Sequence, residues 1–369
     1  MTITAVLSRF REFDFESHLQ EVTPEEINSI LAKDRIDERD FLSLLAPAAQ
    51  SRFEQMAGKA EAITKRHFGK AVTLFTPFYI SNYCDNACRY CSFARQYTIA
   101  RRHLSFEEIR EECQRISESG IRHILVLTGE SRSKASIAYI AESIRIIKEY
   151  FSSVSIEIYP LKEEEYRVLI DQGVDGLTIF QETYDEIEYH GFHKGGPKDD
   201  FTFRLEAPDR ACRQGMRTLS IGALLGLSAV HRDVFFTGLH AHYLRRNYPQ
   251  VELSISLPRI RPLAGDFVPL FPVTDTFFVQ IVMAIRIFLE SAGITISTRE
   301  SRQLRNALLP LGVTKMSAGV STAVGGHSET PSTTQFEIAD HRSVSEMKAD
   351  LLSLGYQPIM QDWNVNFLS

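Results

Sequence analysis

The stretch that decides the fold reads CDNACRYCSF over residues 84–93, directly after the apolar run 72–80, which is typical of a β-strand. Cys84, Cys88 and Cys91 therefore lie on one short loop in the spacing CxxxCxxC. Three thiolates on such a loop can hold three irons of a four-iron, four-sulfur (4Fe–4S) cluster, and no fourth cysteine lies nearby. The loop predicts a cluster whose fourth iron is open to another ligand.

A structural zinc site and a set of inert thiols are the simpler alternatives. Structural zinc uses four ligands, and His103 is the only histidine close downstream of the loop. Thiols without metal on a loop with Asp85, Asn86 and Arg89 would be open to oxidation. The spacing therefore favours the cluster over both alternatives.

The composition is that of an ordinary globular protein. The chain has 369 residues, of which 44% are hydrophobic, and its net charge of −6 argues against a nucleic-acid surface. No run is apolar enough to cross a membrane, and residues 1–15 lack the pattern of a signal peptide, so a cytoplasmic protein is expected. A reducing compartment suits thiolate ligands, and Cys113 and Cys212 are expected to be buried apolar residues.

Eight apolar runs alternate with helical patterns after the first 70 residues. Apolar strands separated by helices predict a parallel sheet buried on both faces, and eight of them predict a (β/α)8 barrel of the TIM type. An open doubly wound sheet would give the same alternation, so the number of strands decides between the two. The predicted strands are 72–80, 121–128, 153–159, 176–181, 217–225, 251–257, 293–298 and 313–318.

The chain divides into three predicted parts. Residues 1–70 are expected to form a helical N-terminal extension, residues 71–320 the barrel, and residues 321–369 a C-terminal lid with a closing helix at 343–354. The polar segment 184–203 is expected to form a second lid.

Polar residues follow the predicted strands at the C-terminal mouth, where such barrels carry their functional sites. For any one of them a polar loop residue is the simpler interpretation, but the set as a whole indicates a site. The residues are Tyr79, Thr128-Gly129-Glu130, Glu157, Gln181-Glu182-Thr183-Tyr184, Leu227-Ser228, Arg259, Arg261, Thr298-Arg299-Glu300 and Ser317-Ala318-Gly319.

The cysteine spacing, with an aromatic residue two positions after the last cysteine, resembles the radical S-adenosyl-L-methionine (SAM) superfamily. The resemblance implies that the open iron takes the amino and carboxylate groups of SAM. Over nearly its whole length the chain is also similar to the 2-iminoacetate synthase family, the tyrosine lyases of bacterial thiamine thiazole synthesis. The segments that carry this similarity are 76–82, 127–130, 180–184, 203–210, 297–301, 316–319 and Gly325-Gly326.

This resemblance implies cleavage of the Cα–Cβ bond of L-tyrosine to 2-iminoacetate and p-cresol, with SAM converted to 5'-deoxyadenosine and methionine. It implies ferredoxin or flavodoxin as the reductant and thiazole synthase as the protein that receives the imine. Three alternatives stay open: a tryptophan lyase, the tyrosine lyase of hydrogenase maturation, and a non-catalytic iron–sulfur electron-transfer or scaffold subunit. The hydrogenase-maturation enzyme carries a second cluster on C-terminal cysteines, whereas this chain has no cysteine after Cys212.

The resemblance also implies which residues bind the cofactors. Cys84, Cys88 and Cys91 would hold the cluster. The residues implied for SAM are Phe93 at the adenine, Gly129 and Glu130 at the amine, Glu157 at the ribose or amine, and Arg204 at the carboxylate. For Arg204, a surface ion pair with Glu206 or Asp209 is the alternative.

Arg299 is the residue implied for the tyrosine carboxylate, with Ser317 and Tyr79 beside it in the amino-acid pocket. A structural ion pair between Arg299 and Glu300 or a neighbouring carboxylate is the alternative. His327 stands where relatives carry an aromatic residue after the Gly-Gly pair, and it marks a departure in the C-terminal lid.

Overall fold

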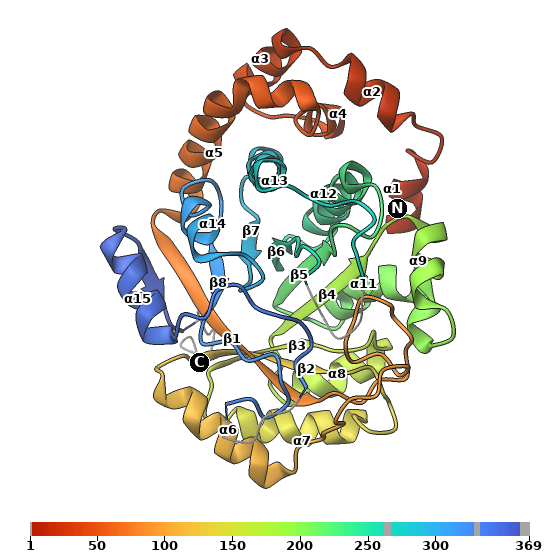
Figure 1. Ribbon diagram of the computed structural model, residues 1–369, viewed down its shortest axis with the longest axis vertical. Helices are drawn as coiled ribbons and strands as arrows, with labels where there is room; N and C mark the ends of the chain where they lie inside the picture. The colour runs from red at the N-terminus through yellow and green to blue at the C-terminus, as the bar shows by residue number, and fades with distance from the viewer. Residues whose placement is uncertain (1, 262–266, 328–332, 362–369) are drawn as a thin grey trace.

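The computed structural model describes residues 2–261, 267–327 and 333–361. Eight parallel strands close into a barrel, because β1 pairs with β2 on one side and with β8 on the other (Figure 1). The predicted (β/α)8 barrel is confirmed, and all eight predicted strands are present. Their bounds are β1 (Ala71–Ser81), β2 (His123–Thr128), β3 (Ser153–Glu157), β4 (Gly176–Glu182), β5 (Thr218–Ala223), β6 (Glu252–Ser256), β7 (Gly293–Ile296) and β8 (Lys315–Ser317).

Helices surround the barrel and cover the outer faces of the strands (Figure 1). Local capping sets where several of them begin: Ser105 and Glu108 form a reciprocal capping box at the start of α6, and Ser343 and Glu346 form another at α15. The outer helices are α6 (Phe106–Glu118), α7 (Ile137–Ile147), α8 (Glu163–Asp171), α11 (Ala207–Arg213), α12 (Val230–Asn247), α13 (Asp275–Phe288), α14 (Arg302–Ala307) and α15 (Val344–Ser353).

The first 70 residues form an arc of helices along one side of the barrel, outside α12 and α13 (Figure 1). Phe41 anchors this arc, because its ring stacks on Phe288 with the centroids 4.6 Å apart. Gly238 of α12 makes room for that ring, since a Cβ there would lie 2.4 Å from Phe41 Cε1. The helices of the arc are α1 (Ile3–Ser8), α2 (Phe15–Glu21), α3 (Pro24–Ala32), α4 (Glu38–Ser43), the 3-10 helix η1 (Pro47–Arg52) and α5 (Phe53–Phe68).

The C-terminal segment adds a ninth strand that the sequence did not predict. β9 (Gln357–Ile359) pairs in parallel with the first residues of β1, outside the closed barrel. It is three residues long, so its sequence carries no apolar run that periodicity could detect. The expected closing helix is α15, which lies on the outer ring beside β9.

The segment 184–203, expected as a lid, is largely helical. It contains α9 (Glu186–His193), the 3-10 helix η2 (Pro197–Asp199) and the start of α10 (Phe201–Leu205). Asp185 caps α9 by accepting hydrogen bonds from the backbone N–H groups of residues 187 and 188. The segment places Lys198 at the functional site described below.

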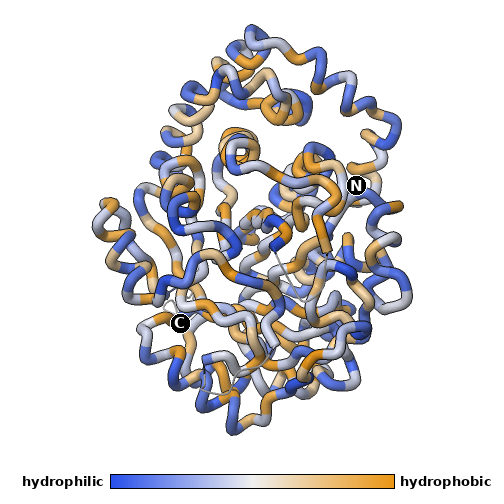
Figure 2. The backbone as a smooth tube through the Cα atoms, viewed as in Figure 1, coloured by the Kyte–Doolittle hydropathy of each residue, from blue (hydrophilic) through white to orange (hydrophobic). Residues whose placement is uncertain are grey.

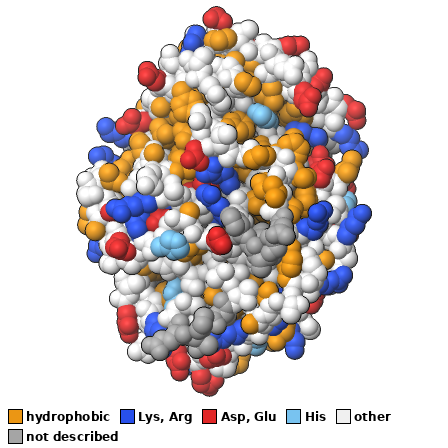
Figure 3. Space-filling model, in the orientation of Figure 1, with side chains coloured by type: hydrophobic (Ala, Val, Ile, Leu, Met, Phe, Trp, Pro, Cys, Tyr) orange, Lys and Arg blue, Asp and Glu red, His pale blue; other side chains and the backbone are white. Residues whose placement is uncertain are grey.

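Hydrophobic and hydrophilic residues alternate along the outer helices (Figure 2), which is typical of helices that rest one face on a core. Charges of both signs are interspersed on the face shown in Figure 3. Within the described residues, no helix combines the length and the apolar character needed to span a membrane.

Candidate active site

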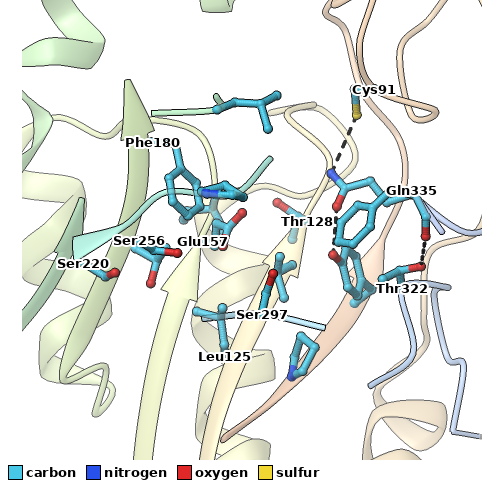
Figure 4. A pocket seen from close by; sticks show the side chains of 18 of the residues that line it. Cys91, Leu125, Thr128, Glu157, Phe180, Ser220, Ser256, Ser297, Thr322 and Gln335 are labelled. Carbon is cyan, nitrogen blue, oxygen red and sulfur yellow. Dashed lines mark hydrogen bonds between the residues drawn. The ribbon is translucent and has the colours of Figure 1, made fainter. Parts of the chain in front are cut away.

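One pocket opens at the C-terminal mouth of the barrel and continues down into its interior (Figure 4). Residues at the C-terminal ends of several strands line it, among them Tyr79, Glu157, Glu182 and Ser317. All eleven residues predicted for the site line this pocket: Tyr79, Cys84, Cys88, Cys91, Phe93, Gly129, Glu130, Glu157, Arg204, Arg299 and Ser317. The individual roles of these residues stay predictions.

The cysteine loop is held against the end of β2 by backbone contacts. The N–H of Asp85 donates to the carbonyl of Glu130 at 3.1 Å, and the N–H of Gly129 donates to the carbonyl of Ser81 at 2.8 Å. A Cβ at Gly129 would lie 2.3 Å from the carbonyl oxygen of Tyr83. Glycine is therefore required at position 129 because the cysteine loop passes directly over it.

A second anchor comes from Arg101, whose guanidinium lies inside the turn that follows the cysteines. Its Nη1 donates to the carbonyls of Asn82 at 2.7 Å and Phe93 at 2.6 Å. Its Nη2 donates to the carbonyl of Ala94 at 2.8 Å. One side chain thus ties both ends of the loop together and fixes Phe93 at the pocket.

The three thiols fit a cluster better than a single metal ion. They line one pocket, yet among the described residues no three His, Cys, Asp or Glu side chains converge closely enough to hold one ion. In a 4Fe–4S cluster each cysteine binds a different iron, so the sulfurs need not converge on one point. Burial, followed by the charge of Glu130, raises the pKa of Cys84 to about 11, so bound iron is needed to keep its thiolate.

Four charged side chains form one buried network beside the cysteines. Lys198 Nζ donates to Glu182 Oε1 at 2.6 Å and lies 3.7 Å from Glu130 Oε1. Arg204 Nη1 donates to Glu130 Oε1 at 3.0 Å, and Arg204 Nη2 donates to Glu182 Oε1 at 3.4 Å. Two carboxylates therefore balance two cations inside the protein.

The network explains the charge state of Glu130. Burial alone would raise the pKa of this carboxyl, but Lys198 and Arg204 lower it below its usual value. Asn86, which lies between two of the cysteines, donates to Glu130 Oε2 at 2.9 Å. Glu130 is thus held as a carboxylate next to the cysteine loop.

The alternative interpretation of Arg204, a surface ion pair with Glu206 or Asp209, is wrong. In the described part of the chain its ion pairs are with Glu130 and Glu182, not with Glu206 or Asp209. Its Nε also donates to the carbonyl of Phe180 at the end of β4, at 2.7 Å. Arg204 is therefore a pocket residue rather than part of a surface ion pair.

Arg299 lies on the other side of the pocket, in a different setting. Its guanidinium stacks on Phe336, with Cζ 3.4 Å from the ring centroid, and Nη1 donates to the carbonyl of Arg259 at 3.4 Å. Glu300, the alternative partner, pairs instead with Arg259 and Arg261. No carboxylate of the described residues lies within ion-pair distance of Arg299, so the interpretation as a structural ion pair with Glu300 is wrong.

Glu157 lies near Arg299 and, among the described residues, has no hydrogen-bonding partner for its side chain. Burial and the negative charge of Glu182 raise the pKa of Glu157 to about 7, although Arg299 opposes the shift. Burial also lowers the pKa of Arg299. The two side chains are of opposite charge type and both line the pocket, but they do not form an ion pair with each other.

Tyr79 and Ser317 flank this side of the pocket. The hydroxyl of Tyr79 donates to Gln335 Oε1 at 2.8 Å. Gln335 Nε2 lies 3.7 Å from Cys91 Sγ, and Figure 4 shows Gln335 pointing toward Cys91. Ser317 Oγ accepts from the N–H of Thr298 at 3.2 Å. A chain of contacts through Gln335 thus joins the cysteine loop to Tyr79 of β1.

Among the pocket residues that the sequence did not indicate are Asn86, Lys198, Gln335 and Phe336. The glycine at position 196 was the one sequence signal for this contact. A Cβ there would lie 2.7 Å from Cα of Asn86, so a residue without a side chain is needed where segment 184–203 packs against the cysteine loop. His327, the departure noted in the sequence, does not line the pocket, and its N–H donates to Glu112 of α6 at 3.0 Å.

Two family models match the chain. The Radical SAM superfamily matches residues 78–236, and the Biotin and Thiamin Synthesis associated domain matches residues 256–357. The first match contains the cysteine loop, and the second contains Arg299, Ser317 and Gln335.

Several known proteins are similar to this chain over nearly its whole length. The chain is 35% identical over 361 residues to 2-iminoacetate synthase of Escherichia coli (strain K12), covering 96% of each chain. The structure of the FeFe-hydrogenase maturase HydG from Carboxydothermus hydrogenoformans has a TM-score of 0.89 at 30% identity, covering 98% of this chain and 85% of that one. Methylornithine synthase (PylB) shares the fold, with a TM-score of 0.73 at 20% identity, covering 90% of this chain and 97% of that one.

The identity over nearly the full length, the closed barrel and the three-cysteine loop lead to one conclusion. A site of this kind takes a 4Fe–4S cluster and SAM, and the donors in the pocket fit both. The chain belongs to the 2-iminoacetate synthase family within the radical SAM superfamily.

Proposed function

We propose that this protein cleaves the Cα–Cβ bond of L-tyrosine to give 2-iminoacetate and p-cresol, for thiamine thiazole biosynthesis. The observation that carries the proposal is the pocket itself, where the cysteine loop faces Arg299, a buried cation without a carboxylate partner among the described residues. An amino-acid substrate brings the carboxylate that such a guanidinium requires. The Escherichia coli relative described above carries one of the two proposed products, 2-iminoacetate, in its name.

Cys84, Cys88 and Cys91 would hold the cluster, and Phe93 would contact the adenine of SAM. When bound, the reduced cluster and SAM would supply the radical chemistry needed to remove a hydrogen atom from the amino group of tyrosine. Glu130 would accept a hydrogen bond from the amine of SAM, and Arg204 would face its carboxylate. These side chains are already fixed by their own network, so they lose little freedom when SAM binds.

On the opposite side Arg299 would bind the tyrosine carboxylate, and Ser317 and Tyr79 would line the amino-acid backbone. Glu157 would accept a hydrogen bond from the ribose or the amine of SAM. Breaking the Cα–Cβ bond gives 2-iminoacetate and a 4-hydroxybenzyl fragment, which gains one electron and one proton to become p-cresol. The protein orients the reactants and excludes water and oxygen.

Two protein partners follow from the chemistry. A low-potential carrier, ferredoxin or flavodoxin, would supply the electrons, and thiazole synthase would take up the imine before it hydrolyses. Residues 321–369 would act as a lid, since Thr322, Gln335 and Phe336 from its described part line the pocket. Residues 328–332 and 362–369 of this predicted lid lie outside the described residues. We place the protein in the cytoplasm, where thiolate ligands stay reduced.

The test is anaerobic incubation of the reconstituted enzyme with SAM, dithionite and tyrosine, followed by mass spectrometry. We expect p-cresol and glyoxylate, the hydrolysis product of 2-iminoacetate, in equal amounts. A parallel incubation with tryptophan tests the related lyase. If 5'-deoxyadenosine forms with tyrosine present but no p-cresol appears, the proposed reaction is refuted.

A further inference from the structure

A buried lysine lies beside the cysteine loop. Lys198, in the 3-10 helix η2, lines the pocket together with Cys84, Cys88 and Cys91, and it is only 8% exposed. The charge of an ammonium acts over several ångströms in such a place, because it is screened far less inside a protein than in water. Lys198 can therefore affect the charge of a group bound by the thiolates without touching it.

Two contacts fix the segment that carries this lysine against the cysteine loop. The backbone N–H of Lys198 donates to Oδ1 of Asn86 at 2.9 Å. The hydroxyl of Tyr90 is hydrogen-bonded to Nε2 of His193 in α9 at 2.6 Å. Asn86 and Tyr90 lie in the two intervals between the cysteines, so the segment meets the loop in both intervals.

The ammonium acts most strongly on two of the three thiols. Lys198 Nζ lies 5.7 Å from the ring centroid of Tyr90, which stands between Cys88 and Cys91 in the sequence. Burial raises the pKa of Cys88, and the charge of Lys198 opposes this shift more than any other charge does. Burial also raises the pKa of Cys91, and Lys198 again acts to lower it. A charge that favours a thiolate at these positions favours any further negative charge placed there.

Reduction places such a charge at this site. A 4Fe–4S cluster gains one negative charge when it takes up an electron, and its reduction potential depends on the charges and hydrogen bonds around it. Lys198 stays protonated, because Glu182 and Glu130 raise its pKa above the ordinary value although burial and Arg204 act to lower it. A fixed positive charge beside the cluster stabilises the reduced form more than the oxidised form.

The charge balance of the network gives this effect a sign that can be tested. Lys198 and Arg204 are balanced by Glu130 and Glu182, and Lys198 Nζ lies 2.6 Å from Glu182 Oε1. Removing one cation leaves the network with a negative charge, whereas removing one carboxylate leaves it with a positive charge. The two changes should therefore move the potential in opposite directions, which a general loosening of the loop would not do.

We propose that Lys198 raises the reduction potential of the cluster: its buried ammonium, held in place by Asn86 and Glu182, stabilises the electron that the cluster takes up from an iron–sulfur or flavin carrier. One electron moves from the carrier to the cluster, and no bond of the protein forms or breaks. The inference depends on the cluster and not on the amino acid that the enzyme cleaves.

The test is an anaerobic redox titration of the reconstituted protein without SAM, followed by electron paramagnetic resonance of the reduced cluster. At a given potential, Lys198→Met should lower the ratio of reduced to oxidised cluster about tenfold, which is about 59 mV for one electron. Glu182→Gln should raise this ratio by a similar factor. The double variant has a neutral network again and should return to within about threefold of the wild type. Lys194→Met, at an exposed lysine of the same segment, is the matched control and should change the ratio less than twofold, because water and salt screen its charge.

Three outcomes would overturn the inference: an unchanged potential in Lys198→Met, a shift of both single variants in the same direction, or a double variant no closer to the wild type than Lys198→Met. If Lys198→Met does not assemble the cluster, Glu182→Gln decides alone. A rise of its potential supports the inference, and an unchanged or lower potential refutes it. The titration contains no amino acid, so its result is independent of the assay for p-cresol.

Discussion

The two sides of the pocket hold their charges differently. On the paired wall, Glu130, Glu182, Lys198 and Arg204 satisfy one another. On the open wall, Glu157 and Arg299 carry charge into the pocket with no ion-pair partner among the described residues. A buried charge without a partner is costly, so such groups are kept where a ligand completes them.

This difference separates preorganisation from recognition. The paired wall has its geometry before any ligand arrives, which suits a surface that must hold the cluster loop and SAM in one arrangement. Under the proposed function the open wall would gain most from binding, because the substrate carboxylate would give Arg299 an ion-pair partner. The following predictions test each wall.

The largest effect is expected at the cysteine loop, on which the paired wall depends. Cys88→Ala should abolish SAM cleavage and lower the iron content of the reconstituted protein, and Cys84→Ala and Cys91→Ala should do the same. Cys212→Ala is the control, because that thiol is buried in α11, away from the pocket. Full iron content and turnover in Cys88→Ala would refute the assignment of Cys88 as a cluster ligand.

On the open wall, Arg299→Lys keeps the positive charge and loses the planar fork that grips a carboxylate. We expect SAM to bind normally, with p-cresol formation reduced on the order of a hundredfold while 5'-deoxyadenosine still forms, because a small displacement of the substrate breaks the coupling. Quantifying both products in one incubation checks this. Near wild-type, coupled p-cresol formation would show that Arg299 is not the carboxylate ligand.

Glu130→Gln tests whether the paired wall faces SAM rather than the amino acid. Losing one charge-assisted hydrogen bond to the SAM amine should weaken SAM binding by about 1.5 to 3 kcal/mol, with a smaller change for tyrosine. Calorimetry with each ligand measures the two effects, and Glu118→Gln on the exposed end of α6 serves as control. If Glu130→Gln weakened only tyrosine binding, the paired wall would face the amino acid rather than SAM, and the assignment of the two walls would be wrong.

The smallest effect concerns Glu157 and pH. Its pKa rises from 4.5 to about 7 on folding, so the folded protein holds the proton more tightly than the unfolded chain does. The stability that this group contributes is full below pH 4.5 and is lost as the pH rises through about 7.

Denaturant unfolding of the apo protein at pH 5 and pH 8, compared with Glu157→Gln, isolates this contribution. Asp233 has a pKa raised to about 7 by burial and adds its own slope, but it is present in both proteins and cancels. If the free energy of unfolding changed equally with pH in the wild type and in Glu157→Gln, the pKa of Glu157 would not be raised in the folded protein.

The features that the sequence predicted correctly are local ones. The apolar strands and the closing helix at 343–354 are each specified within a few residues, and the cysteine spacing lies within eight positions. The strand-end residues could be predicted to meet because all parallel strands end at the same mouth.

What the sequence could not show depends on pairs that are far apart in the chain. Lys198 read as one polar residue in a polar segment, and only the fold brings it to Glu182 and Asn86. Arg204 was assigned wrong alternative partners for the same reason, since Glu206 and Asp209 are near in sequence but do not face it. Asp185 is a typical N-cap residue and was a local signal for α9, but Gly195 and Gly196 in the same segment favoured a loop.

The contact between Gln335 and Cys91 bears on the order in which the protein is assembled. The ribosome makes the cysteine loop early, but β1 gains its second neighbour only when β8 emerges, and Cys91 and Tyr79 gain Gln335 later still. Until then the loop lacks one of its supports and the barrel is open on one side. The cluster therefore finds its finished binding site only near the end of synthesis, and a chain truncated before residue 335 would leave three reactive thiols without the fold that protects them.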